Sequence, residues 1–146
     1  MSEIFLRFIS AQDIEKLDLT CAEIFQTVEE AVRFQGNRGV VLEPRVHLIP
    51  PNSAQGHFNL LRGHLSNPHV SGIKVVGDFP DNYRNKLPSE LAMVTLYSPD
   101  SGVPLAIVDG TMITAARNVA LTALGARYLA RSDGKVLGHI GVRGTA

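Results

Sequence analysis

The long helix predicted for residues 111–131 most constrains how this chain can fold. The segment contains no proline, is rich in alanine and leucine, and has polar starting residues in Asp109 and Thr111. Arg127 and Arg131 fall in its last turn, where cations complement the helix dipole. The sequence therefore predicts one long helix in the last quarter of the chain.

Arg117 is the one charged residue in the middle of this predicted helix. The residues three and four positions away on either side are largely apolar: Ile113, Thr114, Ala120 and Leu121. No Asp or Glu lies between Asp109 and Asp133, so the helix offers this guanidinium no partner. An unpaired charge in an apolar setting is costly, so we expect either a carboxylate from elsewhere in the fold or an anionic ligand to meet Arg117.

The residues after the helix suggest the start of a nucleotide-binding unit. An apolar strand is predicted over 135–140, and Gly141-Val-Arg-Gly-Thr-Ala146 follows it. This loop has the position of a dinucleotide-binding turn, in which backbone amides at a helix N-terminus hold a pyrophosphate. The match is partial, because Arg143 stands where the pattern has its second glycine.

Size and composition narrow the function classes. The chain has 146 residues, 45% of them hydrophobic, and 14 basic residues balance 14 acidic ones, which is ordinary for one globular domain. We expect neither nucleic acid nor a membrane as partner, because there is no basic run and no apolar run long enough to span a bilayer. A single cysteine, Cys21, for which we expect a packing role, fits a reducing cytoplasm. The spacing of the five histidines predicts no metal site.

The rest of the chain predicts an α/β protein whose main part is an α+β domain. Helices are expected from residue 10 and over 19–35. Strands are expected over 4–9, 44–49, 57–61, 70–76, 93–97 and 103–108. The turn sequence at 98–102 predicts a β-hairpin between the last two strands, so the sheet should be mixed and largely antiparallel.

Two further cations occupy predicted strands. Arg45 begins one, and Lys74 lies inside another between Ile73 and Val75, where a cation is depleted unless it has a partner or a function. A partly buried lysine can transfer a proton or hold an anion, whereas an arginine can bind a carboxylate through two parallel hydrogen bonds. The alternative for Lys74 is a side chain that reaches solvent from an edge strand.

The order of these features resembles the ornithine cyclodeaminase/mu-crystallin family. The resemblance rests on Gly-Ile-Lys74-Val-Val-Gly, Asn85-Lys-Leu-Pro-Ser89, the hairpin from Ser101 to Asp109, Ile113-Thr-Ala-Ala-Arg117 and the glycine loop. It covers the chain best from Gly72 onward.

This resemblance implies an NAD- or NADP-dependent enzyme that acts on a small amino or imino acid. The reaction would be the deaminating cyclisation of ornithine to proline, a ketimine or imino-acid reduction, or an amino-acid dehydrogenation. It implies substrate binding by Arg45, Lys74 and Arg117, with Lys74 also catalytic through proton transfer. Ser89, Gly141, Gly144 and Thr145 would contact the cofactor, and a homodimer is expected. The alternative is a non-catalytic binding or oligomerisation module, as in mu-crystallins.

Some features depart from the family pattern. Asn118 stands where the family has threonine, and Arg143 replaces a loop glycine. We expect residues 1–132 to form a substrate-binding and dimerisation domain, and 133–146 to form the first strand and glycine loop of an incomplete Rossmann domain. On this interpretation the chain is the N-terminal part of a longer enzyme, it is inactive alone, and the catalytic Asp lies beyond Ala146.

Overall fold

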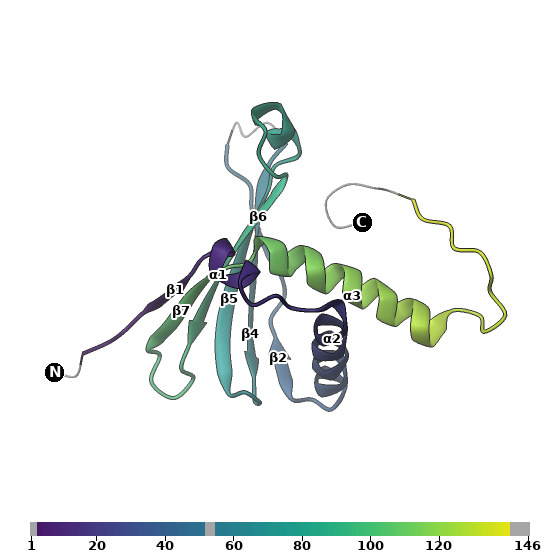
Figure 1. Ribbon diagram of the computed structural model, residues 1–146. Coiled ribbons are helices and arrows are strands. Elements are labelled where there is room, and N and C mark those ends of the chain that lie inside the picture. Colours follow the sequence, from purple (N-terminus) through teal and green to yellow (C-terminus); the bar gives the residue numbers. More distant parts are fainter. Residues whose placement is uncertain (1–2, 52–54, 141–146) are drawn as a thin grey trace.

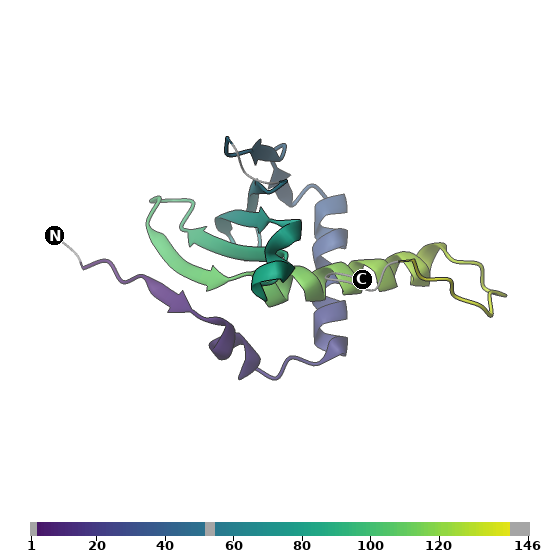
Figure 2. The same ribbon diagram turned by 90° about the horizontal axis from the view of Figure 1, so that it is seen from above.

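The computed structural model describes residues 3–51 and 55–140 of the chain. Within them, one sheet lies beside a pair of contacting helices, α2 and α3 (Figure 1). Figure 2 shows α3 running away from the strands and crossing α2. No helix among the described residues is both long and apolar enough to cross a membrane.

The helices begin where side chains can satisfy the first backbone amides. α1 (Ala11–Glu15) and α2 (Cys21–Gly36) each start with a capping box, built on Ser10 and Thr20. α3 (Thr111–Leu129) has no side-chain cap at Gly110, but Asp109 Oδ1 accepts a hydrogen bond of 2.8 Å from the Thr111 amide. The predicted long helix is confirmed, and it ends two residues before the predicted limit.

The strands form a mixed, largely antiparallel sheet, as predicted. Their bounds are β1 (Arg7–Ile9), β2 (Val40–Leu42), β3 (Val46–Leu48), β4 (His57–Leu65), β5 (Val70–Asp78), β6 (Glu90–Tyr97) and β7 (Pro104–Asp109). The order is β1-β7-β6-β5-β4-β2, and β3 also pairs with β4. Only the β1–β7 pairing is parallel among the described strands. A short 3-10 helix, η1 (Pro80–Asn85), connects β5 to β6.

The predicted hairpin between β6 and β7 is confirmed. The Ser98 amide donates to the Val103 carbonyl and the Gly102 amide donates to the Ser98 carbonyl, both at 2.9 Å. Gly102 adopts a positive φ of 71°, which glycine accepts without steric cost.

The two faces of the sheet differ in burial. The face toward α3, called the inner face, carries Asn59, Lys74, Val76, Ala92 and Ala106 in alternating positions, and all but Lys74 are buried. The helix approaches it closely at Gly110, where an added Cβ would come within 3.2 Å of both the Ala92 and Val94 side chains.

The opposite face, called the outer face, is apolar and open. It carries Ile73, Val75, Leu91, Met93 and Leu105, whose exposed fractions range from 37% to 48%. No helix of the described residues covers these side chains.

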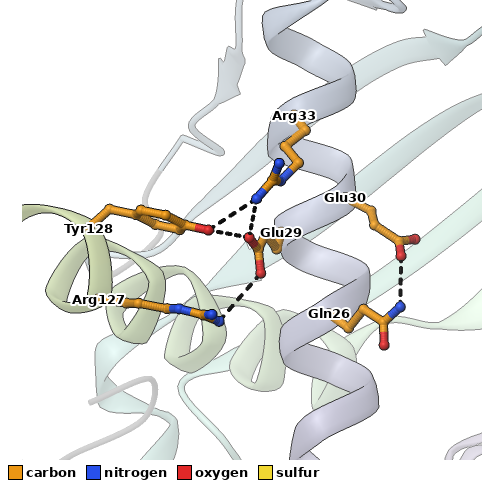
Figure 3. A network of polar contacts seen from close by, with 6 residues as sticks. All are labelled: Gln26, Glu29, Glu30, Arg33, Arg127 and Tyr128. Carbon is orange, nitrogen blue, oxygen red and sulfur yellow. Dashed lines mark hydrogen bonds and ion pairs between the residues drawn. The ribbon is translucent and has the colours of Figure 1, made fainter.

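A polar network joins the two long helices away from the sheet (Figure 3). Glu29 of α2 accepts hydrogen bonds from Arg33 at 2.7 Å and from the hydroxyl of Tyr128 on α3. Arg127 of α3 lies 3.6 Å from the same carboxylate. Hydrogen bonds from Tyr128 and then Arg33 hold the pKa of Glu29 below its usual value. The network therefore ties α3 to α2 through one carboxylate.

Some expectations are corrected. The first strand is shorter than predicted, and β2 was not predicted. Cys21 is exposed at the start of α2, so its predicted packing role is wrong. Residues 135–140, predicted as a strand, are irregular, and Val136, Leu137 and Ile140 are almost fully exposed. A strand requires a hydrogen-bonded neighbour, and none of the described residues provides one there.

Candidate functional site: a cluster of cations on the inner face

Lys74 lies at the centre of the candidate site. It stands in β5 on the inner face, between Val94 of β6 and Leu61 of β4. Its Nζ atom is 3.5 Å from Oγ1 of Thr114, a buried residue in the first turn of α3. Lys74 is thus held between the sheet and the helix, and it belongs to a central strand, not to an edge strand.

Arg117 and Arg45 approach Lys74 from different elements. Arg117 follows Thr114 by three residues on α3, so the two side chains leave the same side of the helix. Arg45 directly precedes β3, and the pairing of Val46 with Leu60 brings it beside the strand that neighbours Lys74. One cluster therefore draws on β3, β5 and α3.

The electrostatics of Lys74 reflect this convergence. Burial lowers the pKa of Lys74 most, followed by the positive charge of Arg117 and then that of Arg45, while Glu90 partly offsets them. Glu90 begins β6 and pairs with Asp78 of β5, two residues along each strand from Val76 and Ala92 on the inner face. Like charges gathered in a half-buried place favour an anionic ligand.

The described residues give this cluster no ion pair. Among their ion pairs, none involves Arg45, Lys74 or Arg117. The alternative that Arg117 is a structural residue paired with a carboxylate across the fold is therefore not observed in the described part of the chain.

Two hollows adjoin the cluster. A cavity of about 300 Å³ has inner-face residues of β4, β5 and β6 in its lining, Lys74 among them. A larger apolar cavity of about 510 Å³ lies between α1, α2 and α3, with Arg117 in its lining. Lys74 and Arg117 thus each border open space large enough for a small molecule, in different cavities, and Arg45 lines neither of them.

The residues predicted to contact the cofactor are placed only in part. Ser89 is half-buried between η1 and β6, where its carbonyl accepts a 2.8 Å hydrogen bond from the Phe79 amide. Gly141, Gly144 and Thr145, as well as Arg143, lie outside the described residues. Asn118 is half-buried on α3, and its carbonyl accepts a hydrogen bond from Thr122. The described residues contain no His, Cys, Asp and Glu group placed to hold a metal ion.

The sequence interpretation missed several polar residues around the cluster: Thr114, Glu90, Asn59 and His57. Asn59 did leave a signal, because it is a polar residue between the apolar Phe58 and Leu60. Glu90 left none, since its place opposite Asp78 depends on the register of β5 and β6.

The chain is similar to known proteins over most of its length. The model of the ornithine cyclodeaminase/mu-crystallin family matches residues 7–146. The chain belongs to this family. Its relatives include NAD-dependent imino-acid reductases and alanine dehydrogenases.

Three similar proteins illustrate the family. Alanine dehydrogenase of Archaeoglobus fulgidus is 32% identical over 91% of this chain and 39% of its own length. The Thermococcus litoralis Δ1-pyrroline-2-carboxylate reductase, solved with NADH and L-proline, has a TM-score of 0.80 and 33% identity, over 88% of this chain and 39% of its own. An archaeal alanine dehydrogenase dimer with bound NAD has a TM-score of 0.77 and 30% identity, over 88% of this chain and 38% of its own. The chain thus spans about two fifths of the length of these relatives.

Proposed function

We propose that this chain forms the carboxylate-binding part of an NAD- or NADP-dependent enzyme that acts on a small amino or imino acid. The observation that carries the proposal is the convergence of Arg45 and Arg117 on Lys74, while none of these three cations takes part in an ion pair among the described residues. The substrate's carboxylate would supply the missing negative charge. The reaction is an imino-acid reduction, an amino-acid dehydrogenation or the deaminating cyclisation of ornithine.

The three cations have different roles in this proposal. Arg45 and Arg117 bind and orient the carboxylate, because a guanidinium fits it with two parallel hydrogen bonds. Lys74 binds beside them and transfers a proton, since the lowered pKa makes its neutral form easier to reach. Thr114 positions the lysine through its hydroxyl.

The nicotinamide cofactor supplies a hydride acceptor or donor when bound. Of the residues assigned to it, only Ser89 is described, and one hydroxyl cannot hold a dinucleotide. The described residues fit the substrate's carboxylate, and the cofactor contacts of Ser89, Gly141, Gly144 and Thr145 stay predictions.

Arg117→Met tests the carboxylate site directly. We expect the change to weaken binding of L-proline or L-alanine at least tenfold, because a hydrogen bond to a charged group contributes about 1.5–3 kcal/mol. Binding can be measured by calorimetry on the chain. Turnover can be followed at the nicotinamide absorbance in a protein that joins this sequence to a complete nucleotide-binding region.

Arg131→Met is the matched control for that experiment. Arg131 lies two residues after the end of α3. It pairs with Asp133 at 2.7 Å and is largely exposed. The control should bind as the unchanged protein does. Equal affinity of the Arg117 variant and the control would refute the carboxylate site.

We also propose that the protein forms a homodimer through the outer face of the sheet. The support is the row of half-exposed apolar side chains on this face and the dimer named for the archaeal alanine dehydrogenase. The rival role, a non-catalytic binding or oligomerisation module, predicts the same dimer but no turnover with any amino or imino acid.

A further inference from the structure

Asn59 carries an unused hydrogen-bond acceptor on the inner face. The residue is only 9% exposed, and within the described residues its Oδ1 atom has no hydrogen-bond partner. Its amide nitrogen is 3.2 Å from Nε2 of His57. Buried acceptors are nearly always paired in folded proteins, so a partner from outside the chain is expected here.

The register places Asn59 beside the cation cluster. Asn59 pairs with Val76, and Leu61 pairs with Lys74, so Asn59 and Lys74 are diagonal neighbours on the same face. Such neighbours are about 7–8 Å apart. Asn59 lies on the side of Lys74 away from the 300 Å³ cavity and its Oδ1 atom is covered, so we expect a small molecule whose carboxylate meets Lys74 to reach the Asn59 amide by displacing neighbouring side chains.

Two histidines hold that amide in place. His47 pairs with Asn59 across β3 and β4. The rings of His47 and His57 are stacked, with centroids 5.3 Å apart and planes 4° apart. The stacked His57 ring accepts from the Asn59 amide nitrogen, and this leaves the oxygen as the free end. A free oxygen binds an N–H or O–H donor and disfavours another acceptor.

We propose that Asn59 is a specificity-determining residue that accepts a hydrogen bond from the substrate nitrogen. The site then selects carboxylates with an adjacent N–H group, such as amino acids and cyclic secondary amines, over carboxylates that lack one. This inference rests on the proposed function, because it takes the cluster at Lys74 as the carboxylate site.

A matched pair of ligands isolates this contact. L-Proline and tetrahydrofuran-2-carboxylate have the same ring size and carboxylate, but only proline carries hydrogen on the ring heteroatom, where its protonated nitrogen also adds a positive charge. The ratio of the two affinities is therefore compared between variants: the preference for L-proline should be about tenfold greater in the unchanged protein than in Asn59→Leu, which is the effect of one hydrogen bond to an otherwise unpaired buried group. Asn59→Asp, which keeps an oxygen at this place, should retain the preference of the unchanged protein.

Folding of the variants is checked independently. Asn59→Leu removes a buried unpaired acceptor, so its melting temperature should equal or exceed that of the unchanged protein. If that variant does not fold, Asn59→Ala, which removes the same oxygen, takes its place in the comparison.

The outcomes separate this inference from the proposed function. An affinity ratio that is the same in Asn59→Leu as in the unchanged protein overturns the role of Asn59 and leaves the carboxylate site standing. If neither ligand binds, or if Arg117→Met binds both normally, the carboxylate site is wrong and the role of Asn59 falls with it.

Discussion

The charged form of Lys74 is disfavoured where it stands, and that is informative about its role. Its ammonium group is half-buried beside two guanidinium groups, and both effects lower its pKa. A residue kept for stability alone would be better replaced by an apolar one of similar length, because buried charges often cost more than they return. We therefore interpret Lys74 as a binding residue whose cost is offset when an anion is present.

Lys74→Met should consequently change stability and binding in opposite directions. We expect the unliganded variant to be as stable as the unchanged protein or about 1 kcal/mol more stable at neutral pH, and its affinity for carboxylates to fall. Thermal unfolding and calorimetry measure the two quantities. A variant that loses stability as well as binding would indicate a structural role instead.

The pH dependence of this difference has a definite sign. The pKa of Lys74 in the folded protein lies below its ordinary value of 10.5. Between these two pKa values the unfolded chain binds the proton and the folded chain does not, so the stability of the unchanged protein rises with pH. The advantage of Lys74→Met should shrink as pH rises through the folded pKa toward 10.5, and it should be fully present below that pKa.

At single residues, the sequence showed that Arg45, Lys74 and Arg117 needed explanation but did not show that they meet. Each is a cation without a nearby carboxylate in an apolar stretch of sequence. The three come together only through long-range contacts, because Arg45 precedes β3, Lys74 lies in β5 and Arg117 lies in α3. The family resemblance supplied their common role. Asn59 was missed, because β4 also carries His57, Arg62 and His64, and a polar residue in such a strand has many explanations until its burial and missing partner are known.

Among the elements, the attachment of α3 to α2 depends on Glu29. The carboxylate accepts from Arg33 and Tyr128 and lies near Arg127, so one residue joins both helices (Figure 3). Its neighbour Glu30 is exposed and, among the described side chains, accepts a hydrogen bond only from Gln26 of the same helix, at 2.9 Å. The two adjacent glutamates therefore form a natural test pair.

Glu29→Gln should lower the melting temperature at neutral pH, whereas Glu30→Gln should leave it nearly unchanged. The pKa of Glu29 is lowered in the folded protein, so its contribution is present above the ordinary value of 4.5 and is lost as pH falls through the folded pKa. The difference between the two variants should therefore disappear at low pH. Calorimetric melting curves from acid to neutral pH measure this difference. Equal effects of both changes would rule out that the Glu29 network attaches α3 to α2.

Helices and strands were predicted correctly where the signal lay within the element itself or in its adjoining turn. α3 was predicted almost completely, because the absence of proline and the residues at its two ends favour a helix without any contact to other elements. The hairpin of β6 and β7 was predicted from the turn at 98–102. β2 was missed because it has only three residues and is defined by its pairing with β4. The apolar pattern at 135–140 predicted a strand whose neighbours are absent from the described residues.

The chain as a whole exposes much more surface than a compact monomer of its mass. The chain exposes 11296 Å², whereas a compact monomer of 15.8 kDa exposes about 7,300 Å². Part of the excess is the apolar outer face of the sheet, and no side chain of the described residues is fully buried. Burial against further protein should therefore add substantially to stability.

Met93→Glu should abolish self-association through the outer face. A carboxylate at the centre of an apolar interface would be desolvated without a partner, so we expect the unchanged chain to elute as a dimer and this variant as a monomer. Size-exclusion chromatography with light scattering gives the mass of each. Leu121→Glu, at a similarly exposed position of α3, is the control and should remain dimeric. A dimeric Met93 variant would place the interface elsewhere.

The path of α3 couples the substrate site to the residues that follow the helix. The helix touches the sheet at Gly110, carries Arg117 in its second turn, and then crosses α2 before the chain continues to residues 130–140 (Figure 1). We expect a rotation of this helix to move the guanidinium of Arg117 relative to Lys74. In that case the proposed carboxylate binding and the orientation of the residues that follow α3 are thermodynamically linked, and each changes the other by the same free energy.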